Sequence, residues 1–530
     1  MQVLINARIL TQDANHPRAD ALAIENGQLV AVGNKDDILS IPCKEKKIVD
    51  LHQSVVLPGL CDSHIHLGQY SQGLSKIDCA TPTRQACLDR VALAAQSAQP
   101  NSWLLGHGWD QNLWEEGFGD AAMLDQITTQ HPIYLTIKSL HAAWINSRAL
   151  KLAGIHAQTP DPAGGTILRH SDGSPTGILL ESAVNLVEAV IPNPSPTEMA
   201  KLIFEAQSRL WRMGITAVHD FDGALTFQGL QLLKQENALK LRVVKNLRQE
   251  QFAGVPALGI HPAFGDDMLR LGVLKCFMDG AIGPHTASVL EPFTNSTSCG
   301  ELLYSEEELY QVYLHAREQG FAVATHAIGD RANQSVLNVI EKIRTYETDH
   351  QLPWVRYRIE HAQILQPEDV ERFASLQVIA SMQPIHLPMD IHTTDTALAG
   401  RGEQSFVFKS LDSRQVKLAF GSDAPVADPN PFLGLHAAVT RMDPATGKSW
   451  HANQRLTLQQ ALDGYTLHPA FAAGMEQIAG KLSPGYLADL IVLESDPTTL
   501  SFEELQTCCP LATMVAGDWV FSTLEGTEND

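Results

Sequence analysis

The chain has 530 residues, of which 44% are hydrophobic, and its formal net charge is −22 at pH 7. The length allows one large domain with additions, or two to three domains. Nucleic-acid phosphates and anionic membranes would repel so acidic a chain, and we therefore expect neither as a partner. A small-molecule substrate is the expected partner, and a homodimer is compatible with the sequence.

Cysteine usage and the N-terminus favour a cytoplasmic protein. The eight cysteines form no CxxC pair, so the sequence shows neither a disulfide framework nor a zinc ribbon. The first residues, MQVLINARIL, are too short and too polar for a signal peptide, and no run of about 18 apolar residues occurs.

Both ends of the chain predict short β-strands joined by tight turns. Residues 20–33 alternate apolar and polar side chains around ENG at 25–27, a typical hairpin turn, and residues 512–521 repeat the style. The simplest arrangement is a small β-sandwich domain built from residues 1–57 and 480–530.

Between the two ends, apolar strands alternate with helical segments. Residues 195–214 predict a helix that Ser195 caps and Gly214 ends, and residues 305–320 predict another with a capping box. The eight strand candidates are residues 55–66, 214–221, 241–247, 271–280, 321–330, 355–364, 376–384 and 416–425. This alternation predicts an α/β fold, a (β/α)8 TIM barrel over residues 58–479, with its active site at the C-terminal ends of the strands.

The chain between the first two strands is longer than a barrel of about 250 residues requires. We predict an inserted lobe at about residues 68–195, where Trp103, Trp109, Trp114 and Trp144 gather. These tryptophans fill the core of the lobe in the simpler interpretation. In the alternative they form a pocket wall that selects an apolar or aromatic substituent, with Trp109 as the candidate substrate contact.

The stretch LPGLCDSHIHLG at residues 57–68 places His64 and His66 one residue apart. In an extended strand, positions i and i+2 share a face, so both imidazoles point the same way. Imidazole is a frequent ligand of zinc and neighbouring metals. The spacing alone is equally compatible with two hydrogen-bonded structural histidines.

Other predicted strands also end in groups that can bind metal. The C-terminal ends of barrel strands converge on one mouth, so residues far apart in sequence would meet there. These further groups are Lys275, His326, His361 and Asp423. Their shared position predicts a centre for a divalent metal, with zinc favoured and one or two ions per chain.

Lys275 lies within the apolar run LGVLKCFM, where burying a charged lysine is costly. In one interpretation its stem is buried and its amine reaches solvent. In the other, burial deprotonates the amine, which reacts with carbon dioxide to give a carbamate that can bridge two metals.

Motifs along nearly the whole chain resemble those of one family. They include LPGLCDSHIH, GHGWDQNLW, HAAWINSRALKLAGI, KCFMDGAIGPHTA, THAIGDRAN, RIEHAQI and FGSDAPV. On these motifs the chain resembles the amidohydrolase superfamily, and more narrowly the YtcJ-like metal-dependent amidohydrolases related to N-substituted formamide deformylases.

The resemblance implies that His64 and His66 hold the more buried of two ions, and that His326 and His361 hold the other. Asp423 would bind the first ion and act as the catalytic proton carrier. The implied reaction is hydrolysis of a carbon–nitrogen bond, other than a peptide bond, in an N-formyl or N-acyl small molecule. Hydroxide generated on a metal, where water has a pKa of about 7, would attack the carbonyl carbon.

The resemblance also implies that Lys275 is carboxylated and bridges the two ions. The chain departs from the family pattern at residues 139–141, which read SLH in place of Asp-Gly-His, and at His285, where an arginine is usual. Both departures lie on the expected substrate side, so they bear on the substrate and not on the metal centre.

Three further residues are candidates for supporting roles. Asp62 and Asp279 could accept the second N–H of ligand histidines, although Asp62 could equally cap the turn. Asp279 and His386 are also candidate substrate contacts.

Three other functions compete with this interpretation. A deaminase of the same superfamily usually has a glutamate three residues after the strand-five histidine, where this chain has Gly329. A lactone or ester hydrolase stays open because the same hydroxide attacks those electrophiles. A non-catalytic barrel scaffold usually loses ligands, and none is missing from this sequence.

Overall fold

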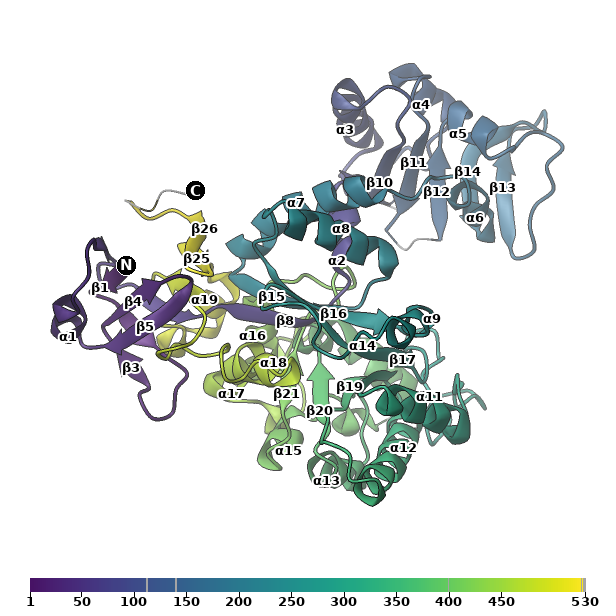
Figure 1. Cartoon of the computed structure of the whole chain (residues 1–530). Helices are drawn as coiled ribbons and strands as arrows, with labels where there is room; N and C mark the ends of the chain where they lie inside the picture. Colours follow the sequence, from purple (N-terminus) through teal and green to yellow (C-terminus); the bar gives the residue numbers. More distant parts are fainter. Residues whose placement is uncertain (111–112, 139–140, 399, 526, 528–530) are drawn as a thin grey trace. The chain divides into compact units, whose positions relative to one another are not determined.

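The computed structural model describes residues 1–110, 113–138, 141–398, 400–525 and 527. The chain divides into two compact units, one of Met1–Tyr70 with Pro196–Asp530 and one of Ser71–Ser195 (Figure 1). Within the described ranges, no helix combines the length and the apolar character that a membrane crossing requires.

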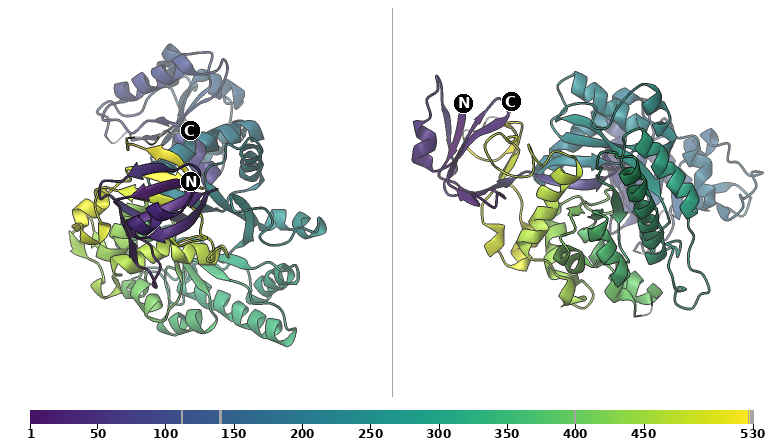
Figure 2. Two further views of the ribbon diagram at one scale, coloured as in Figure 1. Left: turned by 60° about the vertical axis from the view of Figure 1, so that its left-hand side comes forward. Right: turned by 60° about the horizontal axis from the view of Figure 1, so that its bottom comes forward.

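Eight strands of the first unit form one parallel sheet in which chain neighbours are sheet neighbours. They are β8 (Leu60–Ile65), β15 (Ile215–Asp220), β16 (Arg242–Arg248), β17 (Leu269–Phe277), β18 (Val323–Ala327), β19 (Arg358–His361), β20 (Ile379–Met382) and β21 (Leu418–Phe420). Each overlaps its predicted strand segment, although β16 extends one residue beyond the predicted end and β17 begins two residues before the predicted start. The predicted α/β barrel sheet is therefore confirmed, as a nearly closed eight-stranded parallel sheet (Figures 1 and 2).

Helices of the first unit follow most of these strands. The longer ones are α7 (Pro196–Arg212), α8 (Ala224–Gln235), α11 (Glu306–Glu318), α12 (Asp330–Asp349), α13 (Pro367–Ser375), α14 (Leu387–Leu398), α16 (Pro431–Thr440) and α17 (Leu458–Tyr465). The shorter ones are α1 (Lys35–Ser40), α9 (Gln249–Phe252), α10 (Gly254–Ala257), α15 (Phe408–Ser413), α18 (Leu467–Ala472) and α19 (Phe502–Thr507). The helix α2 (Leu67–Leu74) begins in the first unit and ends in the second. As predicted, α11 begins at a capping box, in which the Ser305 hydroxyl accepts from the Glu308 N–H at 3.3 Å and Glu308 accepts in return.

The first and last barrel strands meet just beyond the end of β21. The Asp423 N–H donates to the His64 carbonyl at 2.7 Å, and the His66 N–H donates to the Ala424 carbonyl at 2.9 Å. These bonds bring the segment that carries the predicted Asp423 ligand against the segment that carries the two histidines.

Asp62 reinforces this closure from inside the barrel. Its carboxylate is buried and accepts the backbone N–H groups of His64 at 3.1 Å and Ser422 at 3.0 Å, as well as the Ser422 hydroxyl at 2.5 Å. Gly421 permits the close approach, because a Cβ there would lie 2.4 Å from the His64 nitrogen. Asp62 therefore holds backbone rather than imidazole, in agreement with the turn-capping interpretation.

The two ends of the chain contribute two sheets to the same unit. One has the order β5-β4-β1-β6 and the other β26-β25-β24-β7-β2-β3. Their strands are β1 (Gln2–Ile5), β2 (Arg8–Leu10), β3 (Arg18–Ala19), β4 (Ala21–Glu25), β5 (Gln28–Gly33), β6 (Lys47–Asp50), β7 (Val55–Pro58), β24 (Leu490–Leu493), β25 (Ala512–Val515) and β26 (Asp518–Ser522). Both sheets contribute to one apolar cluster, to which Leu4 and Leu22 bring side chains from the first sheet and Val492 and Met514 from the second. The boundaries of a separate β-sandwich domain stay a prediction.

Two predicted hairpins are present in these sheets, and their turns touch. The turn at Asn26-Gly27 joins β4 to β5, and the turn at Ala516-Gly517 joins β25 to β26. All four residues have positive φ, between 51° and 83°. Gly27 is also confined by space, because a Cβ there would lie 2.9 Å from the Ala516 carbonyl oxygen.

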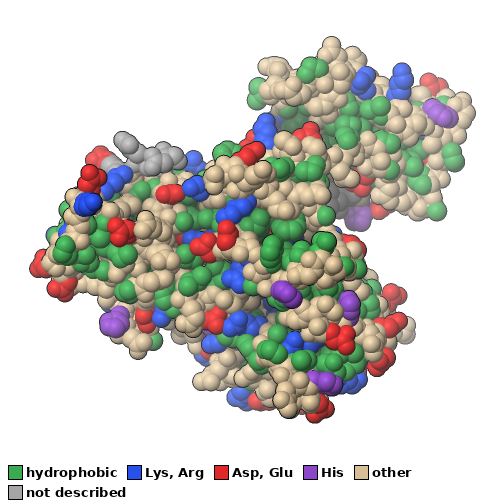
Figure 3. All heavy atoms as spheres, in the orientation of Figure 1, with side chains coloured by type: hydrophobic (Ala, Val, Ile, Leu, Met, Phe, Trp, Pro, Cys, Tyr) green, Lys and Arg blue, Asp and Glu red, His purple; other side chains and the backbone are tan. Residues whose placement is uncertain are grey.

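On the face of the first unit drawn in Figure 3, acidic and basic side chains are interspersed among apolar ones.

The second unit has its own sheet, in the order β13-β14-β12-β11-β10-β9. Its elements are β9 (Ile77–Asp78), α3 (Arg84–Ser97), β10 (Leu104–Trp109), α4 (Ala121–Ile127), β11 (Ile133–Ile137), β12 (Ala142–Ile145), α5 (Ser147–Leu152), β13 (Gly165–Arg169), β14 (Pro175–Glu181) and α6 (Asn185–Glu188). Trp109, Trp114 and Trp144 are buried in one cluster, and the first two stack at 5.8 Å between ring centroids. Each indole N–H donates to a backbone carbonyl, so these rings fill the core.

We predict that Asp62→Ala destabilises the barrel by about 2 to 4 kcal/mol, because it leaves the buried Ser422 N–H and hydroxyl without their acceptor. Urea unfolding followed by fluorescence measures the change. Asp349→Ala, at an exposed carboxylate near the end of α12, is the control and should change stability by less than about 0.5 kcal/mol. Equal stability of the two variants would refute the role of Asp62.

Candidate metal centre

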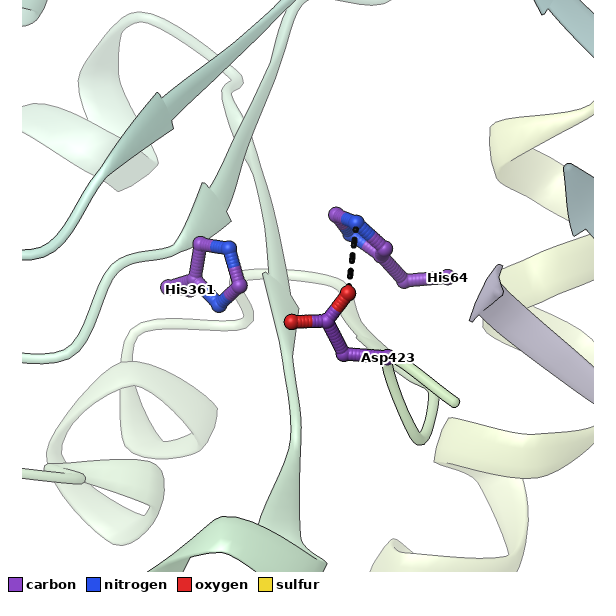
Figure 4. A group of neighbouring side chains, drawn as sticks. All are labelled: His64, His361 and Asp423. Carbon is purple, nitrogen blue, oxygen red and sulfur yellow. Dashed lines mark ion pairs between the residues drawn. The ribbon is translucent and has the colours of Figure 1, made fainter. Parts of the chain in front are cut away.

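The structure gathers the predicted metal-binding residues at the C-terminal ends of the barrel strands. His64 lies on β8 with His66 just beyond its end, Lys275 on β17, His326 on β18, His361 on β19, and Asp423 shortly after β21. Ligand atoms of His64, His361 and Asp423 lie within 4.8 Å of one another, and all three side chains are buried. In Figure 4 the Asp423 carboxylate lies between the two imidazoles.

The closest approaches in this group match the spacing of ligands around one ion. The Asp423 Oδ1 atom is 3.4 Å from the His64 Nε2 atom and 3.3 Å from the His66 Nε2 atom. Two ligands bound tetrahedrally to zinc at the usual bond length would be about 3.3 Å apart. Asp423 is therefore spaced to share a divalent ion with either histidine, whereas the group whose ligand atoms all lie within 4.8 Å of one another consists of His64, His361 and Asp423.

Three of the imidazoles have their Nδ1 atoms occupied by an oxygen acceptor. The pairs are His64 with Glu360 at 2.6 Å, His66 with Asp222 at 3.1 Å, and His361 with the Gln383 amide oxygen at 2.8 Å. Such a bond fixes the ring orientation and the tautomer, so that the Nε2 lone pair can bind a metal. In His326 the arrangement is reversed, because its Nε2 atom is bonded to the Gly280 carbonyl at 3.0 Å and its Nδ1 atom is left to bind.

Burial keeps most of these imidazoles uncharged, which is the form that binds metal. It lowers the pKa of His64 to about 4 and that of His326 to about 3, and it holds the pKa of His361 well below its ordinary value. For His66, burial also lowers the pKa, but hydrogen bonds to Asp222 and Asp423 raise it to about 9. A proton and a divalent cation therefore compete for the space between His66 and Asp423.

Asp423 is ionised and conformationally strained. Burial raises the pKa of its carboxyl, but electrostatic interaction with the His64 ring and the hydrogen bond from His66 outweigh burial and hold the pKa well below its usual value. The backbone is in the left-handed region at Asp423 (φ 60°) and also at His361 (φ 71°). Non-glycine residues in this region cost free energy and cluster at functional sites.

Lys275 is buried beside the group and does not reach solvent. Its Nζ atom lies 4.8 Å from the ring centroids of both Phe221 and Phe277, and no hydrogen-bond partner for it exists within the described ranges. Burial lowers the pKa of the amine to about 8, although the charges of Glu360 and Asp423 oppose the shift. A buried amine without a hydrogen-bond partner is unfavourable. It fits a site in which the amine is converted to an anionic group that binds cations.

Asp279 has a structural role in the described structure. Its carboxylate accepts the backbone N–H groups of Ser288 at 2.9 Å, Ile328 at 3.0 Å and Gly329 at 2.8 Å, and one oxygen is 3.6 Å from His326 Nε2. Burial raises the pKa of this carboxyl to about 7, against those hydrogen bonds. Asp279 therefore anchors the loops behind His326, and its contact with substrate stays a prediction.

The other two predicted substrate contacts lie in different units. His386 is buried at the end of the short helical turn that follows β20. Its Nε2 atom is bonded to the Ser422 carbonyl at 3.1 Å, and its ring centroid is 6.3 Å from that of His361. Its place beside the metal residues suits a substrate contact. Trp109 lies in the core of the second unit, which agrees with the simpler, core-filling interpretation.

Sequence reasoning missed the residues that orient the ligands, namely Glu360, Asp222 and Gln383. A signal was present for Glu360, since Arg358 and Glu360 are oppositely charged residues of the predicted strand at two positions that share a face. The structure pairs these two side chains at 2.6 Å. Lys245 on β16 is a further charged residue within a predicted strand, and the structure pairs it with Asp220 on β15 at 2.8 Å.

A parallel eight-stranded barrel with imidazoles and a carboxylate at the C-terminal ends of its strands is the architecture of metal-dependent barrel hydrolases. The sequence places the chain within that class. It belongs to the amidohydrolase family, whose profile matches residues 47–521. The resemblance noted from the motifs is thereby confirmed.

Three relatives match this chain over nearly its full length. Protein LONG AFTER FAR-RED 3 of Arabidopsis thaliana is 32% identical, covering 98% of this chain and 91% of its own. "Putative amidohydrolase YtcJ" of Bacillus subtilis is 30% identical over 95% of this chain and 96% of its own. The N-substituted formamide deformylase of Arthrobacter pascens is 27% identical over 97% of both chains.

A solved structure agrees with the same assignment. It is an uncharacterized metal-dependent hydrolase from Pyrococcus furiosus, 26% identical in sequence, with a TM-score of 0.80 over 94% of this chain and 100% of that one. Together with the family match, this likeness shows that the chain has the metal-dependent hydrolase fold of the amidohydrolases.

We predict that Glu360→Gln weakens metal binding by about 10- to 100-fold. The neutral amide cannot balance the charge of Arg358, and it accepts the hydrogen bond from His64 less strongly, so the imidazole is oriented less firmly. Competition with a chelator of known affinity measures the change. Glu347→Gln is the matched control, since Glu347 is also a buried carboxylate paired with arginines, at 2.6 and 2.8 Å, but lies away from the metal residues. Equal losses of affinity in the two variants would contradict the orienting role of Glu360.

Proposed function

We propose that the protein is a metal-dependent hydrolase that cleaves a carbon–nitrogen bond, other than a peptide bond, in a small N-formyl or N-acyl compound. One observation carries the proposal: oriented imidazoles and an ionised carboxylate converge at the barrel mouth, with ligand atoms within 4.8 Å of one another. A buried amine that has no partner in the described ranges lies beside them.

The proposed ligands fall into two sets. The first ion would be held by His64, His66 and Asp423, and the second by His326 and His361, with Lys275 bridging. We propose zinc, because nitrogen and carboxylate ligands in tetrahedral spacing suit that ion. When bound, a divalent ion lowers the pKa of water to about 7 and polarises a carbonyl oxygen.

Asp423 is the residue to which we assign proton transfer. Its carboxylate is ionised and faces the space between His64 and His66, so it can accept a proton from the attacking water. It can then pass that proton to the leaving nitrogen, which would otherwise depart as a strongly basic anion. The backbone bond from Asp423 to His64 holds the carboxylate in this position.

The substrate class rests on the family and on one named relative. Amidohydrolases take their name from carbon–nitrogen hydrolysis, and the relative from Arthrobacter pascens is named for acting on N-substituted formamides. Both support an amide of an amine, with a short acyl or formyl group, as the substrate of this protein.

We also propose that Lys275 is carboxylated. The uncharged Nζ atom would attack the carbon of carbon dioxide, so that a nitrogen–carbon bond forms, one proton leaves the nitrogen, and a carbamate results whose single negative charge is shared by its two oxygens. Its place between Phe221 and Phe277, where burial lowers the pKa of the amine, favours the reactive uncharged form.

The protein purified without chelator should contain one to two equivalents of a divalent metal per chain, measured by elemental analysis, and should hydrolyse members of a panel of N-formyl and N-acyl amines. His64→Ala should lose both metal and activity, because it removes an oriented ligand. His52→Ala is the control, since that side chain is 86% exposed.

Less than about 0.3 equivalents of metal, unchanged by His64→Ala, would overturn the proposal of a metal centre. A metal-loaded protein that hydrolyses lactones or esters, and no amide of the panel, would overturn the proposed bond specificity alone.

Lys275→Ala should lose the second ion and most activity, and added short carboxylates should restore part of both by replacing the carbamate oxygens. Labelled bicarbonate should give a carbamate carbon signal by NMR that this variant lacks. Lys342→Ala, at an exposed lysine on α12, should behave as the parent protein. An unmodified amine beside a single ion would establish a mononuclear site instead.

A further inference from the structure

A cavity lies at the opposite end of the barrel from the metal residues. Its wall is formed by the starts of β8, β15, β16 and β17 together with residues 466–489, and the space inside it that the centre of a water-sized molecule can occupy is about 50 Å³. Most of the wall is apolar, and Ala217, Val243 and Met475 contribute to it. Small ligands typically occupy concave, mostly apolar sites with a few convergent polar groups.

One cation in this wall is unpaired. The other cations are matched with carboxylates: Arg242 with Asp489 at 2.5 Å and with Asp267 at 3.1 Å, and Lys481 with Asp13 at 3.3 Å. The Arg270 guanidinium has no hydrogen bond or ion pair with any described residue. Burial lowers its pKa, and the charge of Asp267 in the same wall opposes this shift. A partly buried cation of this kind gains free energy when an anion binds beside it.

A second donor in the wall also lacks an acceptor. His219 is only 2% exposed and lines the cavity. Its Nδ1 atom is 3.0 Å from an Arg358 nitrogen, and since arginine can only donate, Nδ1 is the acceptor and Nε2 carries the proton. No acceptor for this Nε2–H occurs among the residues that the structure describes. This N–H is therefore available to an acceptor that enters the cavity.

From these contacts we infer that the cavity is a binding site for a small carboxylate with a short apolar chain. The carboxylate accepts hydrogen bonds from the Arg270 guanidinium and from the His219 Nε2–H. The alkyl chain lies against Ala217, Val243 and Met475 and removes their surface from water. An inorganic anion would leave this apolar wall unfilled, which is why a ligand with both features is favoured.

Titration calorimetry of the full-length protein with butyrate and with butyramide tests the inference. The two probes have the same shape, and only butyrate carries the charge. We expect butyrate to bind at least about tenfold more tightly than butyramide, because a charge-assisted hydrogen bond is stronger than a neutral one. Arg270→Met should weaken butyrate binding by at least about tenfold, and Arg270→Lys should weaken it less.

Two further variants locate the site. Arg212→Met, at an exposed arginine whose guanidinium lies over the Phe521 ring, is the control and should bind butyrate as the parent does. Ala217→Leu fills the cavity without changing its charge and should abolish binding while its melting temperature shows that it is folded. The inference would be overturned if butyrate did not bind. It would also be overturned if Arg270→Met bound butyrate as tightly as the parent protein does, as binding at the metal residues would predict.

Discussion

The carboxylate of Glu360 is the group on which the geometry of the candidate metal centre depends. It is fully buried and accepts from Arg358 and from His64, both at 2.6 Å. Burial raises the pKa of this carboxyl, but the charge of Arg358 and the hydrogen bond from His64 hold it well below its ordinary value, so that the group is ionised. Because an ionised carboxylate can only accept, His64 must donate from Nδ1 and keep Nε2 available as a ligand.

A second arrangement of the same kind supports the neighbouring ligand. Asp222 accepts from His66 and also from the Gln69 backbone N–H at 3.0 Å, so it fixes both the ring and the start of α2. Two residues earlier, Asp220 pairs with Lys245 inside the barrel. Buried ion pairs seldom increase stability over an apolar core of equal volume. Their concentration directly behind two histidines is explained by the orientation that they impose.

The sequence predicted what depends on local pattern. The eight barrel strands, the hairpin turn at residues 25–27 and the capping box at Ser305 each follow from side-chain periodicity or from turn chemistry that acts within a few residues. Convergence of His64 and Asp423 followed from a general rule of parallel barrels, in which functional residues lie at the C-terminal ends of strands.

The remaining features depend on contacts between distant segments, and no local pattern encodes them. Glu360 reaches His64 across 296 residues of sequence, and Asp222 reaches His66 across 156. Asp62 and Asp279 both accept backbone N–H groups, and this role likewise depends on which loops lie beside them. Sequence could name them as carboxylates near ligands, but the partner of each is set by the closed barrel.

Arg358 connects the two ends of the barrel interior through fixed contacts. Besides Glu360, its guanidinium donates to the Ser63 carbonyl on β8 at 2.9 Å, to the Ser381 hydroxyl on β20 at 2.7 Å and to His219 on β15 at 3.0 Å. Partners on three other strands over-determine its position, so the guanidinium cannot move without breaking several buried hydrogen bonds at once. A ligand that binds to His219 would therefore act on the metal centre through charge and polarisation rather than through displacement. The rigidity that keeps His64 oriented is thus the same property that limits how the far end of the barrel can influence it.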